Sequence, residues 1–144
     1  MIKIKNKKIY IIIIILLLLD QISKLVFLKI GATGDIKSIE NNVAYRVLIS
    51  IVVIILILRY INSNNSYIKI DTKIILSIGV SGIIGNLMDL VWKKDVITFI
   101  NIFSDIKINL AYIFIIIAWV GMAVILTKNT MNILKEKGNK KDGN

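Results

Sequence analysis

The carboxylates and amides that interrupt the long apolar runs are the residues best placed to do chemistry. Asp20 and Lys24 stand four residues apart, and Asn86 and Asp89 stand three apart further along the chain. A charged side chain at membrane depth is costly and persists only where it is paired, hydrated or functional. Because the chain has no histidine and no cysteine, an acid or base here must be a carboxylate, lysine or tyrosine.

Each of these pairs has a structural and a functional interpretation. Asp20 and Lys24 share a helix face in the favourable orientation for an ion pair. They either form a structural pair near the outer interface, with Lys24 snorkelling to water, or organise a polar site inside the bundle. Asn86 and Asp89 follow a Gly-x-x-Gly-x-x-Gly pattern that ends at Gly85 and permits a neighbouring backbone to approach closely. Asn86 therefore either bridges packed helices or belongs to the same site.

The elements that must position these side chains are transmembrane helices. Apolar residues make up 56% of the 144 residues, and the mean hydropathy is +0.77. A span needs about 20 apolar residues, and four candidate spans are expected at about residues 9–30, 44–60, 70–91 and 110–127. We predict an all-α integral membrane protein with one domain over residues 1–144. It is a four-transmembrane-helix bundle with a small extracytoplasmic segment between the first two spans and a basic tail over 128–144.

The net charge of +10 is distributed in the manner of a membrane protein. Lysine and arginine gather before the first span, between the second and third, and after the fourth, and are fewer in the other two connections. The positive-inside rule then places both termini in the cytoplasm. Dispersed charges without interleaved aromatic residues exclude nucleic acid as the expected partner and suit anionic membrane lipids. No metal site or cofactor is expected, because the usual ligands are missing.

Several segments together resemble the signal peptidase II family, the lipoprotein signal peptidases. Gly-x-x-Gly-Asn-x-x-Asp over 82–89 is the most specific match, and Asp-x-x-x-Lys over 20–24 is similar to the family's first-helix signature. Asn109-Leu110-Ala111 and, more weakly, Asn41 fit two further motifs in the expected order. The resemblance implies a multi-pass protein of the bacterial cytoplasmic membrane whose partners are the signal peptides of lipid-modified pro-lipoproteins. It also implies an aspartic endopeptidase.

The catalytic positions depart from the family. Counting from Asp89, the two family aspartates correspond to Thr98 and Tyr112. An aspartyl mechanism needs two carboxylates that share a proton, and neither threonine nor a phenol, which ordinarily stays protonated at neutral pH, can replace them. Asp95 and Asp105 are the possible substitute acids in the neighbouring connection.

Two supporting positions also bear on the chemistry. Asp20 with Asp89 is another conceivable acid pair, although Lys24 would keep Asp20 ionised. Leu90 replaces a family arginine, so a partner for Asp89 is expected to be missing.

Three functions remain open from the sequence. The first is a signal-peptidase-II-like protein that engages lipoprotein signal peptides without cutting them. The second is an active lipoprotein signal peptidase that cleaves before a lipid-modified cysteine using unusual residues. The third is a small transporter or immunity-type membrane protein whose polar pairs line a solute path, although the chain lacks the second inverted half that many transporters have.

Overall fold

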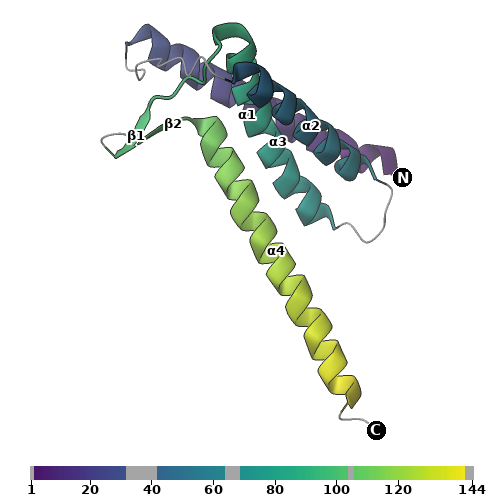
Figure 1. Cartoon of the computed structure of the whole chain (residues 1–144). Helices are drawn as coiled ribbons and strands as arrows, with labels where there is room; N and C mark the ends of the chain where they lie inside the picture. Colours follow the sequence, from purple (N-terminus) through teal and green to yellow (C-terminus); the bar gives the residue numbers. More distant parts are fainter. Residues whose placement is uncertain (1, 32–41, 64–68, 104–105, 142–144) are drawn as a thin grey trace.

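The chain forms four long helices and one short hairpin in the order α1 (Ile2–Lys29), α2 (Val43–Asn62), α3 (Ile70–Lys93), β1 (Ile100–Phe103), β2 (Ile106–Ile108) and α4 (Leu110–Lys141). This computed structural model describes residues 2–31, 42–63, 69–103 and 106–141 (Figure 1). Each of the four helices contains a stretch that is long and apolar enough to cross a membrane. The predicted all-α, four-span membrane fold is confirmed.

The helix boundaries differ from the prediction mainly at the two ends of the chain. α1 begins before the apolar run, and α4 continues to Lys141 instead of ending near residue 127. Within the described residues, the expected basic tail over 128–144 is therefore a continuation of α4. Lysine and glutamate are good helix formers and no proline interrupts the segment, so nothing in its sequence ends the helix where the apolar residues stop.

α3 is the central helix of the bundle and packs against α1, α2 and α4. Half of its candidate span is buried, compared with 17% or less for the other three. Its buried face carries small residues, among them Gly79, Gly82 and Gly85. A side chain at Gly82 would collide with the carbonyl oxygen of Ala111 on α4. The glycine pattern thus brings α3 and α4 into backbone contact, as small-residue stripes do in membranes.

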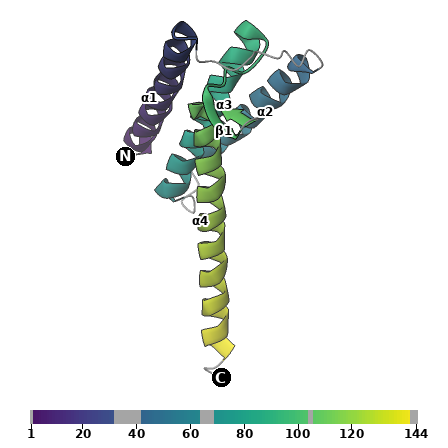
Figure 2. The ribbon, with the colours of Figure 1, turned by 90° about the vertical axis from the view of Figure 1, so that its left-hand side faces the viewer.

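The helices alternate in direction, so their ends fall into two groups. Figure 1 shows the start of α1, the end of α2 and the start of α3 toward the right and the C-terminal end of α4 toward the lower right, with the hairpin at the left; Figure 2 shows the same helices from that left-hand side. α2 and α4 both pack on α3 but make few contacts with each other. The α2 and α4 surfaces beside α3 therefore bound a space that no described helix fills.

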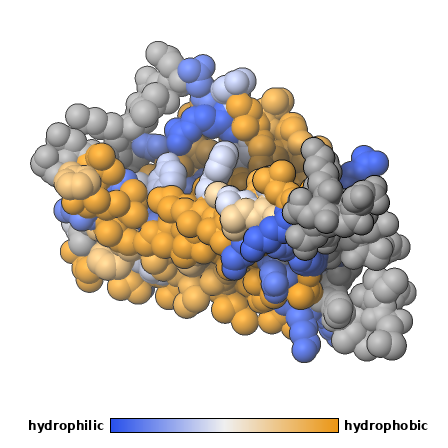
Figure 3. All heavy atoms as spheres, turned by 90° about the horizontal axis from the view of Figure 1, so that it is seen from below, coloured by the Kyte–Doolittle hydropathy of each residue, from blue (hydrophilic) through white to orange (hydrophobic). Residues whose placement is uncertain are grey.

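The outer surface is strongly apolar. Large side chains such as Ile14, Leu18, Leu48 and Leu56 are more than half exposed. Apolar residues cover most of the face drawn in Figure 3, and hydrophilic residues gather in a few patches. Such a surface would cause aggregation in water, whereas lipid acyl chains cover it without cost. This arrangement is that of a multi-pass membrane protein.

The hairpin before α4 was not predicted from the sequence. β1 pairs antiparallel with β2, with Ile100 opposite Ile108 and Asn101 opposite Lys107. The alternation of Ile106, Lys107 and Ile108 is a period-two pattern that indicates a strand, and the run is short enough to be overlooked beside four long helices.

Candidate functional site

The two polar pairs of the sequence meet in one buried cluster. The ammonium nitrogen of Lys24 lies 2.6 Å from Oδ2 of Asp20 and 2.7 Å from Oδ2 of Asp89. Asp20 and Lys24 are 0% and 1% exposed, and Asp89 is 3% exposed. The alternative in which Lys24 snorkels toward water is wrong, because two buried carboxylates hold its ammonium inside the bundle.

Two asparagines extend this cluster to the start of α4. The side-chain amide nitrogen of Asn109 donates to Oδ1 of Asn86 at 2.9 Å and to the carbonyl oxygen of Ile97 at 2.8 Å. Oδ1 of Asn109 accepts from the backbone N–H of Tyr112 at 2.8 Å. Asn109 immediately precedes α4, so its side chain acts as the N-cap of that helix. The cap fixes the first turn of α4 against α3.

Asp20 contacts the same turn from α1. Its Oδ1 accepts the backbone N–H of Ala111 at 2.9 Å, which satisfies another donor that the helix itself leaves unpaired. A carboxylate is also electrostatically favourable at a helix N-terminus. Gly85 makes this approach possible, because a Cβ there would lie 2.5 Å from Oδ2 of Asp20.

Asp89 has partners in spite of the leucine that follows it. Lys24 supplies the positive charge, and the backbone N–H of Ile97 donates to Oδ2 of Asp89 at 3.3 Å. The expected missing partner, inferred from Leu90 in place of the family arginine, is thus replaced by Lys24. Leu90 itself is buried.

The cluster is suited to holding helices rather than to transferring protons. No buried side-chain nitrogen or oxygen of the described residues lacks a hydrogen-bond partner. The Lys24 ammonium contacts both carboxylates, whereas the two carboxylates of an aspartyl dyad share a proton with each other. The structure thus joins two pairs that the sequence presents separately.

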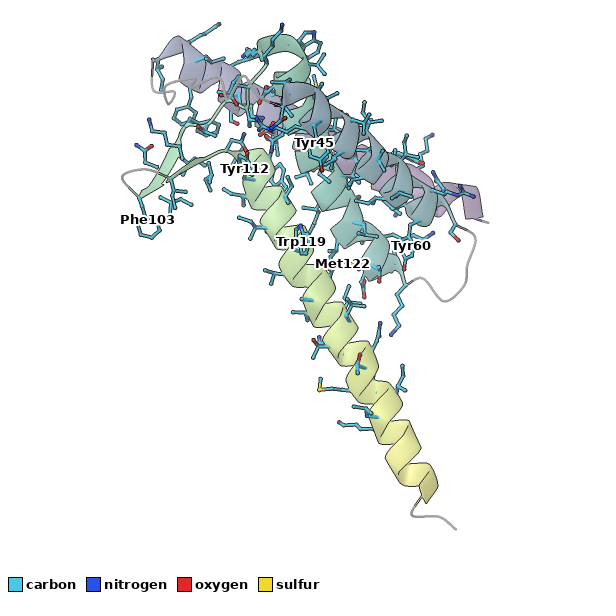
Figure 4. The ribbon with its side chains drawn as sticks, viewed as in Figure 1. Tyr45, Tyr60, Phe103, Tyr112, Trp119 and Met122 are labelled. Atoms are coloured by element: carbon cyan, nitrogen blue, oxygen red, sulfur yellow. The ribbon has the colours of Figure 1, made fainter. Side chains whose placement is uncertain are left out.

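The two family dyad positions face one hollow beside this cluster. Thr98 and Tyr112 both line a space of about 270 Å³ whose wall also contains Arg46, Asp95 and Lys107. Tyr112 lies in the first turn of α4, at the end of the helix nearest the hairpin (Figure 4). Neither side-chain hydroxyl donates to or accepts from another described residue. Both hydroxyls therefore remain available to a ligand.

Of the two proposed substitute acids, one lies in this hollow. Oδ1 of Asp95 accepts the backbone N–H of Val96 at 2.8 Å and lies 3.8 Å from Nη1 of Arg46. No second carboxylate of the described residues lines the same space. Asp105, the other candidate, and Asn41 lie outside the described residues. The described part of the hollow thus holds one carboxylate, whereas an aspartyl dyad needs two.

Sequence reasoning missed the cationic wall of the hollow. Arg46, in the first turn of α2, and Lys107, on β2, both line it. In the sequence, Arg46 is a single charge in an otherwise apolar segment, and Lys107 is one of several charges between the third and fourth apolar runs. Neither position by itself indicates a shared site. The pairing of β1 with β2 is what carries Lys107 to the site.

Two further hollows continue from this one along α3. The next, of about 280 Å³, shares Arg46, Val96 and Tyr112 with the first. A third, of about 270 Å³, shares Ile83 and Ile115 with the second. Every side chain of the third hollow is apolar, and Trp119 and Met122 of α4 contribute to its wall (Figure 4). We call the three adjoining hollows the α2/α4 groove.

Two solved structures, each described as a bacterial membrane enzyme determined by the in meso method, share this fold. One, at 2.3 Å resolution, has a TM-score of 0.74 and 19% sequence identity, with 88% of this chain and 91% of that chain covered. The other, at 1.9 Å resolution, has a TM-score of 0.71 and 16% identity, with 83% and 92% covered. No family model and no curated protein matches the chain. The likeness therefore establishes the fold of a bacterial membrane enzyme.

Proposed function

We propose that this chain is a signal-peptidase-II-like membrane protein that engages lipoprotein signal peptides without hydrolysing them. The family is suggested by the motif resemblance, and the fold shared with bacterial membrane enzymes is consistent with it. The ligand would be a diacylglyceryl-modified signal segment, whose apolar helix and acyl chains suit the apolar part of the α2/α4 groove. A protein of this kind would compete with, chaperone or regulate an active peptidase in the bacterial cytoplasmic membrane.

One observation carries the proposal. Thr98 and Tyr112, which correspond to the family's two aspartates, line one hollow at the polar end of an apolar groove. This arrangement supports a binding site for a peptide, and the carboxylate pair is absent from the two corresponding positions. Two hydroxyls can orient a peptide carbonyl by hydrogen bonding, but at neutral pH they do not supply the base that activates water.

A second candidate is an active peptidase that uses Asp95. This carboxylate lines the same hollow as Thr98 and Tyr112 and is close to Arg46. However, an aspartyl mechanism requires a second carboxylate, and the described part of the hollow offers none beside Asp95. A solute path, the third alternative, is disfavoured by the wholly apolar lining of the third hollow.

Saturable binding of a lipid-modified signal peptide tests the proposal. A fluorescent diacylglyceryl-modified peptide is titrated against the purified full-length chain in detergent. Ile83 lines two of the hollows, so Ile83→Trp should fill the groove and weaken binding by about tenfold or more. Val120→Trp is the matched control, because Val120 is exposed on α4 and lines none of the three hollows. Absence of saturation, or equal effects of the two tryptophans, would reject the proposed function.

A further inference from the structure

The polar end of the α2/α4 groove has an unusual charge for a site that the resemblance expects to be acidic. Arg46, Lys107 and Asp95 are its charged groups, so the described wall carries a net positive charge. Two uncharged hydroxyls, from Thr98 and Tyr112, stand where the family has two negative charges. This end of the groove therefore attracts anions, whereas an aspartyl dyad would repel them.

Arg46 is the best-placed donor for an anionic ligand. Its side chain is one-third exposed and 3.8 Å from Asp95, a distance beyond hydrogen bonding. Beyond this loose ion pair with Asp95, its side chain makes no hydrogen bond to any described residue, so its N–H donors can still bind a ligand. The planar fork of a guanidinium matches the oxygens of a phosphate in a bidentate geometry.

Lys107 and the two hydroxyls complete a ring of donors around the hollow. Lys107 is exposed on β2 and makes no ion pair among the residues that the structure describes. The hydroxyls of Thr98 and Tyr112 can each donate one hydrogen bond. Asp95 opposes an anion, but it is single and is itself bonded to the backbone N–H of Val96.

The neighbouring hollows indicate what the anion is attached to. The groove passes from the charged end, through a second hollow that aliphatic and polar side chains line together, to a third lined by aliphatic side chains, Trp119 and Met122, without a charged group. α2 and α4 make few contacts with each other, so the groove is open toward the apolar surface of the bundle. A free phosphate would leave this apolar length empty, whereas the acyl chains of a lipid would fill it.

We propose that the α2/α4 groove binds an anionic phospholipid, with its phosphate between Arg46, Lys107 and Tyr112 and its acyl chains along the apolar hollows. Basic pockets between transmembrane helices are known to select anionic head groups in this way. The inference uses the same groove as the proposed function but does not depend on it. A chain that binds such a lipid and no signal peptide would overturn the proposed function alone.

Native mass spectrometry of the full-length chain in detergent tests this assignment with three additives. These are dioleoylphosphatidylglycerol, which is anionic, dioleoylphosphatidylcholine, which is neutral overall, and inorganic phosphate. We expect phosphatidylglycerol to bind about tenfold or more tightly than phosphatidylcholine, because the two share the phosphate and only phosphatidylcholine adds a cation, which Arg46 and Lys107 repel. Equal binding of the two lipids would overturn the anion assignment. Full displacement of the lipid by inorganic phosphate would overturn the lipid assignment.

Matched variants separate the groove from the basic surface of the protein. Arg46→Gln should weaken phosphatidylglycerol binding about tenfold, whereas Arg59→Gln, at the opposite end of the same helix, should change it less than about twofold. Equal losses would mean general attraction to basic residues and would reject the site. Asp95→Asn removes the opposing charge, so binding should strengthen. An unchanged affinity in Asp95→Asn, with wild-type melting temperature, would contradict the proposed location.

Discussion

Lys24 is the cation on which the buried charge cluster depends. Its ammonium is the shared partner of Asp20 and Asp89, both of which are buried. Removing it leaves two carboxylates without a cation in a low-dielectric interior, and breaking a buried ion pair typically costs about 3–5 kcal/mol. The same substitution on the exposed surface of a helix costs little.

Lys24→Ala should therefore lower the melting temperature in detergent markedly, and Lys29→Ala should not. Lys29 is a matched control because it lies on the same helix and is exposed. Thermal unfolding followed by intrinsic fluorescence gives the comparison. Asp89→Leu should resemble Lys24→Ala, whereas Asp95→Asn should remain close to wild type. Equal tolerance of all four variants would mean that the cluster is hydrated and does not hold the helices.

Thr98 and Tyr112 are the two residues expected to decide whether this hollow can cleave a peptide. Because both correspond to family aspartates and share a hollow, we predict that Thr98→Asp combined with Tyr112→Asp gains peptidase activity. Either change alone should give none, since residues that act as a unit are strongly non-additive. Processing of a lipid-modified pro-lipoprotein in cells without another such peptidase measures the gain. Activity in one single variant, equal to that of the double variant, would refute a requirement for two carboxylates.

The backbones of α3 and α4 are in close contact at Gly82. A Cβ at Gly82 would collide with the carbonyl oxygen of Ala111, which cannot move without shifting α4. A Cβ at Gly121 would meet only the side chain of Ile75, which can adopt another rotamer. The first substitution therefore displaces a helix, and the second displaces a side chain.

Gly82→Ala should destabilise the protein by about 1–3 kcal/mol, the usual cost of overpacking, and Gly121→Ala by less. Urea or SDS unfolding monitored by circular dichroism would rank the two variants. Gly82→Ala should also weaken ligand binding, because α4 carries Tyr112 into the groove. A Gly82→Ala variant as stable as Gly121→Ala would show that the α3–α4 contact is looser than described.

The elements also show why the sequence predicted the helices better than the site. Four long apolar runs and a glycine pattern at helical spacing are local signals, and they indicated the spans and the buried face of α3. The bond between Asp20 and Ala111 joins residues 91 positions apart, and no local pattern carries such a contact. The sequence likewise treated the two polar pairs separately, because the position of Lys24 between Asp20 and Asp89 depends on how α1 packs against α3.

The orientation of the helices in the membrane determines from which side a ligand can reach the polar end of the groove. The helices alternate in direction, with the hairpin toward the opposite side from the start of α1 (Figure 1). The distribution of lysine and arginine predicts that the termini are cytoplasmic, which places the polar end of the groove on the outer face. A lipoprotein precursor and an outer-leaflet lipid would both reach it there.

Single cysteines test this orientation directly, because the chain contains none of its own. Lys93→Cys, at the end of α3, should react with a membrane-impermeant maleimide in intact cells or spheroplasts. Asn62→Cys, at the end of α2, should react only after the membrane is opened. The reverse labelling pattern would place the groove on the cytoplasmic side.

Binding of a lipid-modified signal peptide without hydrolysis can be measured in one experiment. A fluorescent diacylglyceryl-modified pro-lipoprotein fragment is incubated with an equimolar amount of the purified chain, and the mixture is analysed for both complex and peptide length. We predict that the peptide is bound and remains intact, because the groove retains its apolar wall while Thr98 and Tyr112 supply no carboxylate pair. A peptide cut before its lipid-modified cysteine, or one that never enters a complex, would contradict the account.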